Sequence, residues 1–306
     1  MTAPATTLQN APPPAALESE VPHRSGRRGL DRKRLFLWSL PILFFIAAAI
    51  IGPYIWPYDS LEVRTGDRLQ PPLAILKDGS RAWLGTDKVG RDILAQILEG
   101  ARISLIVGGA TIVLAGSIGL TFGVLAGYRG GFSDSLLMRL ADIQLAFPSI
   151  LLAIMIAAVL GPSVTNVILT LSLTRWVIFA RVARAATLTA KEREYVLAAR
   201  ATGVPPLRML VKHIIPATIP PLLVIATVEV GLVIIAEASL SFLGLGVQPP
   251  TASWGNIINT AQSPAVLQQM PWTWIPAGVL IAVSVLSINF VGDGLRDTLD
   301  PRSRRR

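Results

Sequence analysis

Few side chains in this 306-residue sequence are of the types that usually carry out covalent or redox chemistry. The chain has no cysteine, which excludes disulfides, thiolate catalysis and cysteine-based metal sites. It has two histidines, His23 and His213, which are too few for a histidine-rich metal centre. We therefore predict no catalytic residue, no metal site and no bound cofactor.

The sequence also lacks a phosphate-binding loop. Such a loop needs a glycine followed by lysine and then serine or threonine, so that backbone amides and the lysine cradle the phosphates. None of the five lysines follows a glycine. No Gly-x-Ser-x-Gly motif of a serine hydrolase is present, and His213 lies in a basic stretch that is typical of a surface. Any ATP-driven process in which this chain takes part therefore needs ATP hydrolysis by another subunit.

Three carboxyl groups lie within or close to long apolar runs, namely Asp142, Glu229 and Glu237. Burying a carboxylate in a membrane is costly, so such groups usually line a pathway or form an ion pair. Glu229 is expected to be paired or to face a pore, and Arg175 is the candidate partner. Asp142 can instead lie at a membrane interface and Glu237 in an outer vestibule. Glu229 and Glu237 are our candidate pore residues.

Residues 187–216 form a polar, basic stretch between two apolar runs, which we call loop 187–216. Thr189 and Glu192 have the spacing of a capping box, which predicts a helix over 190–202. Gly203 suits the left-handed backbone position just after a helix end. Pro205 and Pro206 stop that helix and can open a second one at its first turn.

The second helix of loop 187–216 is predicted to be amphipathic. Its apolar residues recur at helical spacing, at Leu207, Leu210, Val211, Ile214 and Ile215. Arg208 and Lys212 fall on the other face, and Pro216 is expected to end the helix. Such an element can rest on lipid with its cations at anionic headgroups. It can also insert into a groove on a cytoplasmic partner, and the pattern leaves both interpretations open.

The composition predicts an all-α polytopic membrane protein. The chain is 52% hydrophobic and only 15% charged, with a mean hydropathy of +0.55, whereas soluble domains carry about 25% charged residues. A span needs about 20 apolar residues, and six runs are long enough, at 35–55, 103–126, 140–160, 164–182, 219–243 and 274–291. A further amphipathic helix at 91–102 is predicted to lie on the membrane surface.

Charge along the chain predicts its orientation. Basic residues exceed acidic ones six to one in 24–34, eight to two in 175–213 and five to three in 292–306. With six spans these segments share one side, and the positive-inside rule makes that side cytoplasmic. Because the cations flank apolar runs, the net charge of +9 indicates a membrane protein and not a nucleic-acid partner. Residues 1–34 are predicted to be a disordered basic tail and 35–306 the membrane domain.

Small residues follow a four-residue repeat in the second predicted span. Gly119, Gly123 and Gly127 lie on one stripe of the helix, where they would let a second helix backbone approach closely. We predict a helix-packing role for these glycines in preference to a gating role.

Part of loop 187–216 resembles a known motif. The segment from Glu194 to Gly203, EYVLAARATG, with Ile214, Ile215 and Pro216 further on, resembles the EAA loop of bacterial ABC importer permeases. Ala198-Ala199 and Gly203 stand in the expected places. Ile215 replaces the leucine that is usual in the family, which keeps that position apolar.

Further motifs, in order, resemble the second permease subunit of dipeptide, oligopeptide and nickel importers. They are Trp83-Leu84-Gly85-Thr86-Asp87, Gly100-Ala101-Arg102-Ile103-Ser104-Leu105, Ala146-Phe147-Pro148-Ser149, Glu237 to Gly246, Trp254-Gly255 and Gly292 to Asp297. The resemblance covers residues 35–302 and leaves out the N-terminal tail.

The resemblance implies a type I ABC importer permease in the bacterial inner membrane, with six spans and both termini cytoplasmic. Its implied partners are a second homologous permease, two cytoplasmic ATP-binding cassette subunits and an extracytoplasmic binding protein. Loop 187–216 would couple to the ATPase. The residues that carry over to this role are Glu194, Ala198, Ala199, Arg200, Gly203, Leu207, Ile214 and Pro216, although Glu192 could replace Glu194.

The implied substrate class is di- or oligopeptides, while nickel, glutathione and other solutes use relatives of the same family. An ion-coupled secondary transporter is the alternative function, because membrane carboxylates also serve proton relays. A membrane-embedded enzyme is a third class, for which we find no catalytic constellation.

Overall fold

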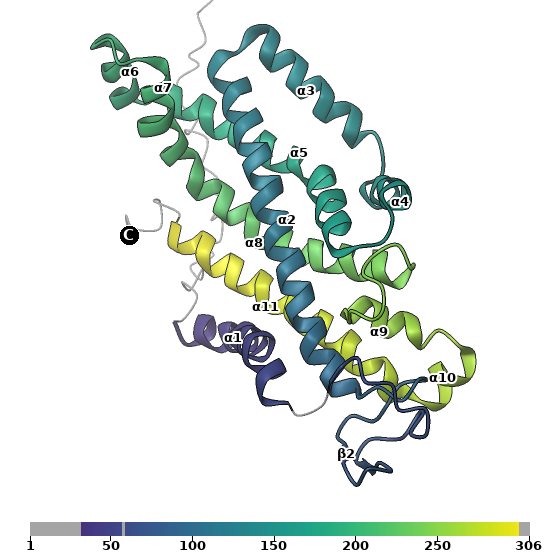
Figure 1. Cartoon of the computed structure of the whole chain (residues 1–306). Helices are drawn as coiled ribbons and strands as arrows, with labels where there is room; N and C mark the ends of the chain where they lie inside the picture. Colours follow the sequence, from purple (N-terminus) through teal and green to yellow (C-terminus); the bar gives the residue numbers. More distant parts are fainter. Residues whose placement is uncertain (1–31, 57–58, 300–306) are drawn as a thin grey trace, which may run out of the picture.

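The structure is a computed structural model that describes residues 32–56 and 59–299. The predicted disordered tail, 1–34, lies outside the described residues except for its last three positions. The regular elements of the described part are helices, apart from one short antiparallel strand pair (Figure 1). The elements are α1 (Arg32–Ile55), β1 (Ala74–Ile75), β2 (Arg81–Ala82), α2 (Ile93–Arg129), α3 (Gly131–Leu145), α4 (Ser149–Leu160), α5 (Val164–Lys191), α6 (Glu194–Ala201), α7 (Pro206–Met209), η1 (Leu210–Ile214), α8 (Ile215–Phe242), α9 (Trp254–Thr260), α10 (Pro264–Gln269), η2 (Pro271–Thr273) and α11 (Ile275–Leu299).

Helix α2 runs through the whole molecule and contacts most of the other long helices (Figure 1). Its 37 residues give a length of about 55 Å, which exceeds the thickness of a bilayer with its headgroups. Asp92 caps its start by accepting a hydrogen bond from the amide of Ala95 at 2.7 Å, and Gly130, with φ +67°, ends it. The prediction of a separate surface helix at 91–102 is therefore wrong, because residues 93–102 are the first turns of α2. Their apolar side, with Ile93, Ile97 and Ala101, is buried in a cluster with Phe45 of α1 and Trp254 of α9.

The glycine stripe of α2 lies directly against α5. A Cβ atom on Gly123 would come within 2.6 Å of the Ala183 Cβ, and one on Gly127 would come within 2.8 Å of the Thr187 Cβ. Gly119 is equally crowded by Phe179. The two backbones touch because these residues have no side chain, which is how helices pack closely in a membrane.

The third predicted span is broken into two helices. The expectation of one helix over 140–160 is wrong, because α3 ends at Leu145, α4 begins at Ser149, and their axes differ by 90°. Pro148 is the physical reason, since it has no amide hydrogen and disfavours helical geometry in the residue before it. Gly161, with φ +80°, then turns the chain from α4 into α5.

Four helices in the described residues are long and apolar enough to cross a membrane: α2, α5, α8 together with its preceding turns, and α11. The bent α3–α4 pair counts as a fifth if it is one span. The described residues of α1 contain a shorter apolar stretch, Leu43–Gly52. The all-α polytopic membrane fold is confirmed, and a sixth span formed by α1 stays a prediction.

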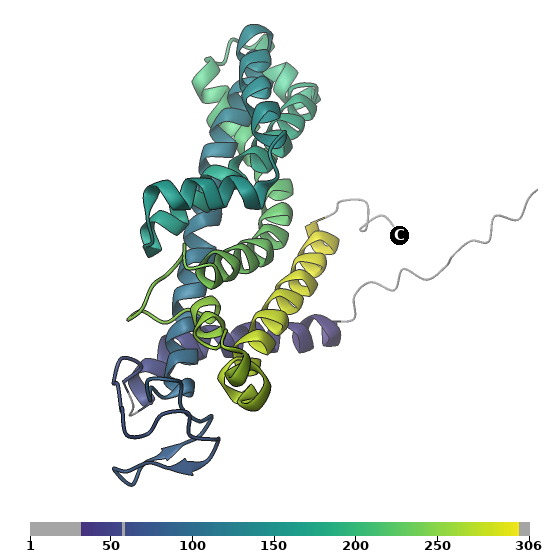
Figure 2. The same cartoon turned by 90° about the vertical axis from the view of Figure 1, so that its right-hand side faces the viewer.

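The two ends of the molecule have different character (Figures 1 and 2). The β1–β2 hairpin, α9 and α10 gather at one end, and α6 and α7 lie at the other. Trp254, the first residue of α9, is buried at the hairpin end. Its indole nitrogen donates a hydrogen bond to the carbonyl oxygen of Ile97 in α2 at 3.2 Å. Gly100 of α2 allows this close approach, since a Cβ there would come within 2.9 Å of the Trp254 ring. Gly255 in turn lets α9 lie against α8, since a Cβ there would clash with the backbone of Ala238.

Replacing Gly123 with alanine tests the α2–α5 contact. We expect Gly123→Ala to lower the stability of the chain by about 1–3 kcal/mol, because the added methyl group overpacks the interface. Gly109→Ala in the same helix is the matched control, since nothing lies within 4 Å of a Cβ at that position. The measurement is the thermal unfolding midpoint of the purified protein in detergent. Equal midpoints for the two variants would show that the interface is loose.

Candidate functional site

Loop 187–216 folds as three short helical pieces between α5 and α8 (Figure 1). Its start differs from the prediction, because α5 continues through Thr189 to Lys191 and the Thr189 hydroxyl donates to the Ala185 carbonyl. No capping box forms, and α6 covers only Glu194–Ala201. Helix α5 extends this far because Thr187 and Ala190 remain buried on its inner face.

The turn between α6 and α7 has the predicted geometry. Gly203 has φ +79°, the left-handed conformation, and its amide donates to the carbonyl of Arg200 at 3.1 Å. The Val204 amide donates to the Ala199 carbonyl at 3.2 Å, which satisfies a second carbonyl at the helix end. Pro206 then occupies the first turn of α7, where its missing amide hydrogen leaves no hydrogen bond unmade.

The apolar stripe predicted for the second helix is divided between two faces. Ile214 is fully buried, while Leu207 and Val211 are 73% and 56% exposed. The reason is the π-helical turn η1, in which the amide of Ile215 bonds to the carbonyl of Leu210. This wider turn breaks the 3.6-residue register on which the stripe was based. Pro216 also does not end the helix, because it lies in the first turn of α8.

The buried side of the loop is seated on α2. Val196 of α6, Met209 of α7 and Ile214 of η1 are at most 1% exposed and pack with Val124 of α2. The Lys191 ammonium group donates to the carbonyl of Gly127 at 2.9 Å, at the end of the glycine stripe. Sequence reasoning missed Val196 and Met209, because each stands beside other apolar residues, Leu197 and Leu210, from which the sequence does not distinguish it. The loop is thus held against the membrane helices by its own small core.

The outer side of the loop carries exposed apolar groups among charged ones. Tyr195, Leu197, Leu207 and Val211 are each at least 45% exposed. Of the predicted coupling residues, Ala199 is half-buried, Ile214 is buried, and the others are exposed: Glu194, Ala198, Arg200, Gly203, Leu207 and Pro216. The exposed side of the loop is therefore an apolar surface with charged residues around it, at one end of the molecule.

The carboxyl groups in the apolar runs all have partners. Glu229 of α8 forms an ion pair with Arg175 of α5, with Oε2 and Nη1 separated by 3.4 Å, so the predicted pairing is confirmed. Asp142 of α3 forms an exposed ion pair with Arg181 of α5 at 2.6 Å. Both pairs join α5 to a neighbouring helix.

Glu237 lies in the core of the molecule and not in an open vestibule. Its side chain is inaccessible, and its carboxyl oxygens accept hydrogen bonds from the hydroxyls of Ser241 at 2.8 Å and Ser104 at 3.2 Å. Ser104 belongs to α2, and the Ser241 hydroxyl also accepts from the Val247 amide. The carboxyl group therefore fastens α8 to α2 and to the start of segment 243–273, which joins α8 to α11. The roles of these serines were not apparent from spacing.

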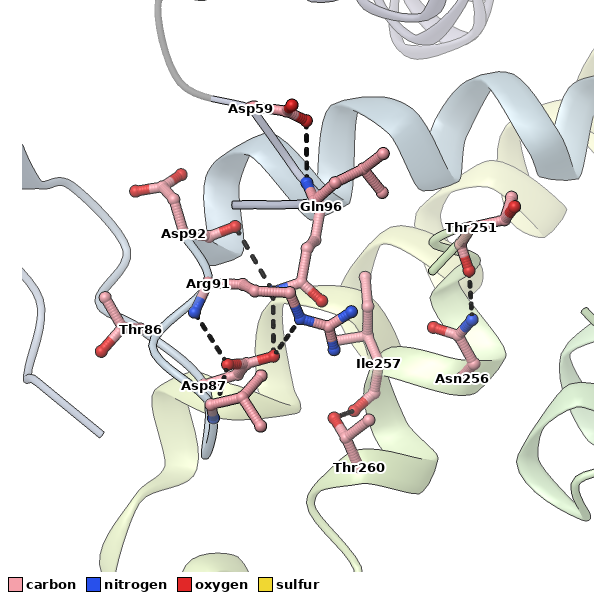
Figure 3. Close-up of polar contacts among 12 residues, drawn as sticks. Asp59, Thr86, Asp87, Arg91, Asp92, Gln96, Thr251, Asn256, Ile257 and Thr260 are labelled. Atoms are coloured by element: carbon pink, nitrogen blue, oxygen red, sulfur yellow. Dashed lines mark hydrogen bonds and ion pairs between the residues drawn. The ribbon is translucent and has the colours of Figure 1, made fainter. Parts of the chain in front are cut away.

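A second polar cluster, at the hairpin end, was also missed (Figure 3). The Arg91 guanidinium and the Asp87 carboxylate form a buried ion pair at 2.9 Å, and the Gln96 amide donates to the same carboxylate at 3.3 Å (Figure 3). Burial raises the pKa of the neighbouring Asp92 carboxyl above its ordinary value. These contacts hold the hairpin segment on the first turns of α2. No group of metal-ligating side chains occurs among the described residues.

These features define a class of protein: a helical membrane protein with a folded loop at one end and the β1–β2 hairpin, α9 and α10 at the other. Residues 119–305 match the family described as binding-protein-dependent transport system inner membrane component. The chain belongs to this family, and it is a permease subunit of an ABC importer in the inner membrane, as the motifs predicted.

Relatives cover nearly the whole chain. A putative peptide permease protein of Brucella suis is 42% identical over 92% of this chain and 91% of its own length. The dipeptide transport system permease protein DppC of Alkalihalophilus pseudofirmus is 39% identical over 98% and 96%. The glutathione transport system permease protein GsiD of Pectobacterium atrosepticum is 40% identical over 90% and 89%.

A solved structure supports the fold. The inward-facing MetNI methionine ABC transporter contains a chain that aligns with a TM-score of 0.54 at 19% identity. The alignment covers 67% of this chain and 96% of that one. The importer permease fold is thereby shown.

Truncating Met209 tests whether the loop is seated on α2. We expect Met209→Ala to destabilise the loop by about 2–5 kcal/mol, because it removes a fully buried side chain. Leu207→Ala, two residues away and exposed, is the matched control. Limited proteolysis at the arginines and lysines of loop 187–216 is the measurement, and faster cleavage is expected only in Met209→Ala. Equal cleavage of both variants would contradict a seated loop.

Proposed function

We propose that this chain is one of two homologous permease subunits that together form the pore of an importer for di- or oligopeptides or a chemically related small solute. In this proposal loop 187–216 seats on a cytoplasmic ATPase subunit, which hydrolyses ATP for the complex. The observation that carries the proposal is the two-sided loop: its core is packed on α2, while Tyr195, Leu197, Leu207 and Val211 are exposed.

The distribution of charge favours a protein partner over lipid for this surface. A helix that rests on lipid separates its apolar and charged faces. Here the exposed apolar residues of α6, α7 and η1 alternate with the exposed charges Glu194, Arg200 and Arg208. An apolar centre with a polar rim is typical of protein interfaces. Glu194, Ala198, Arg200 and Leu207 are therefore our proposed contacts with the ATPase.

The proposed substrate class is inferred from the names of the similar proteins. Proteins named as peptide, dipeptide and glutathione permeases match this chain at about equal identity over most of its length. These solutes share amide bonds and terminal charges, so a small peptide is the solute class we propose. An extracytoplasmic binding protein would deliver it to the hairpin end of the molecule.

A second permease subunit would complete the pore. Helix α4 exposes the apolar side chains Leu151, Met155 and Val159, and a helix of 12 residues spans only about 18 Å. A homologous subunit would cover this face. The basic excess on the loop side supports cytoplasmic termini.

Affinity purification of the tagged chain from membranes, with partners identified by mass spectrometry, tests the proposed function. We expect an ATP-binding cassette subunit and a second permease to copurify. Purification without any nucleotide-binding subunit, together with uptake that survives loss of the ATPase, would contradict the importer proposal and favour an ion-coupled transporter.

A charge placed on the exposed loop surface tests the docking role. We expect Val211→Asp to reduce ATPase copurification at least about tenfold, because burying an unpaired carboxylate in an interface costs several kcal/mol. Val63→Asp is the control, since Val63 lies at the hairpin end with 55% exposure against 56% for Val211. If both variants retain the ATPase equally, loop 187–216 is not the docking surface.

A further inference from the structure

The ion pair between Arg175 and Glu229 lies at the middle of two long helices. Arg175 precedes the end of α5 at Lys191 by 16 residues, and Glu229 follows the start of α8 at Ile215 by 14. Both residues therefore lie about 20 Å along their helices from loop 187–216. Among the described residues, this is the one ion pair that joins α5 to α8.

Helix α5 and the loop are parts of one closely packed body with α2. The glycine stripe brings the α2 and α5 backbones into contact, and the loop core packs on Val124 of the same helix. The hydrogen bond from Lys191 to Gly127 joins the three. A movement of the loop would therefore move α5 directly.

The backbone connection from the loop to α8 is weaker. It passes through the π-helical turn η1 and then through three prolines, Pro216, Pro220 and Pro221. Each proline removes an amide donor from the helix, and π-turns and prolines are where helices bend. This segment can absorb a displacement of the loop before it reaches the middle of α8.

We propose that the Arg175–Glu229 ion pair, which we call the α5–α8 ion pair, makes α8 follow α5 when the loop moves. This inference deepens the proposed function and rests on it. The apolar contacts between the two helices, such as Phe179 with Leu222, are non-directional and permit sliding. An ion pair with a separation of 3.4 Å restricts the relative position of the two helices along their length.

The geometry of the pair favours this role over a purely stabilising one. Buried ion pairs often add little stability relative to apolar replacements, and their best-attested use is to specify an arrangement. The two groups make a single contact, and the buried Nε of Arg175 has no hydrogen-bond partner. A single contact that leaves a buried donor unpaired contributes less stability than a bidentate pair would.

The test is a distance measurement in the purified importer complex. The chain has no native cysteine, so Leu169→Cys on α5 and Ile235→Cys on α8 provide two spin-label sites after accessible cysteines of the partner subunits are removed. Both positions are exposed in this chain and lie beyond the ion pair, on the hairpin side. Double electron–electron resonance then reports the α5–α8 distance without nucleotide and after trapping with ATP and vanadate.

Three backgrounds separate a coupling role from a structural one. The first is the otherwise unchanged chain, in which we expect the distance to be the same in both states. The second carries Arg175→Met and Glu229→Leu together. This apolar pair removes both charges, so that no unpaired charge is left in the interior. Here we expect the distance distribution to shift or broaden on trapping. The third carries Leu222→Ala, which opens a cavity in the same interface but keeps the ion pair, and should behave as the first.

Three results would overturn the inference: an apolar-pair variant in which the distance stays constant, an otherwise unchanged chain in which it shifts on trapping, or a Leu222→Ala variant in which it shifts as it does in the apolar pair. Failure of the proposed function would be recognised separately, because a complex without ATPase activity or without a copurifying cassette subunit contradicts the importer itself. If the double variant fails to assemble, Arg175→Lys keeps a charge pair with different geometry. With Arg175→Lys we expect a broader distance distribution after trapping than in the unchanged chain, and a constant distribution would also overturn the inference.

Discussion

The backbone contact between α2 and α5 is the interaction on which the rest of the structure depends. It is possible because Gly119, Gly123 and Gly127 have no side chains, so packing between the helices replaces contacts with lipid. The α5 helix continues along this contact to Lys191, which places loop 187–216 against the end of α2. The small core of the loop then completes the same surface through Val124. The position of loop 187–216 is thus a consequence of the packing between α2 and α5.

The polar groups of the membrane region are placed where they join elements. Glu229 connects α8 to α5, and Glu237 connects α8 to α2 and to segment 243–273 through two serine hydroxyls. Each group would be costly if it were alone in a low-dielectric interior, so its partner is a requirement of the fold. The same requirement fixes the relative positions of helices that apolar contacts alone would leave free to slide.

Rigid and compliant parts alternate along the chain. The α2–α5 contact and the buried Trp254 are closely packed, whereas Pro148, η1 and the prolines of α8 interrupt regular hydrogen bonding. The interruptions lie beside the loop or between α3 and α4, and prolines and π-helical turns are where helices bend. This chain therefore combines closely packed helix pairs with defined places at which its helices can bend.

The sequence by itself determined the class of fold, the approximate apolar runs, the Gly203 turn, the glycine contact face and the family, because these depend on composition, local backbone preference and motif order. It also indicated that Glu229 needs a partner such as Arg175, since an unpaired charge in a membrane is costly. It could not predict that 91–102 continues into α2 or that Thr189 belongs to α5, because burial under α9 and against α2 overrides local signals. Only the tertiary structure decided which side of the loop is exposed, since the π-turn at 210–214 changes the register of the stripe. The same holds for Glu237, whose serine partners come from α2 and α8 and meet only when both helices pack.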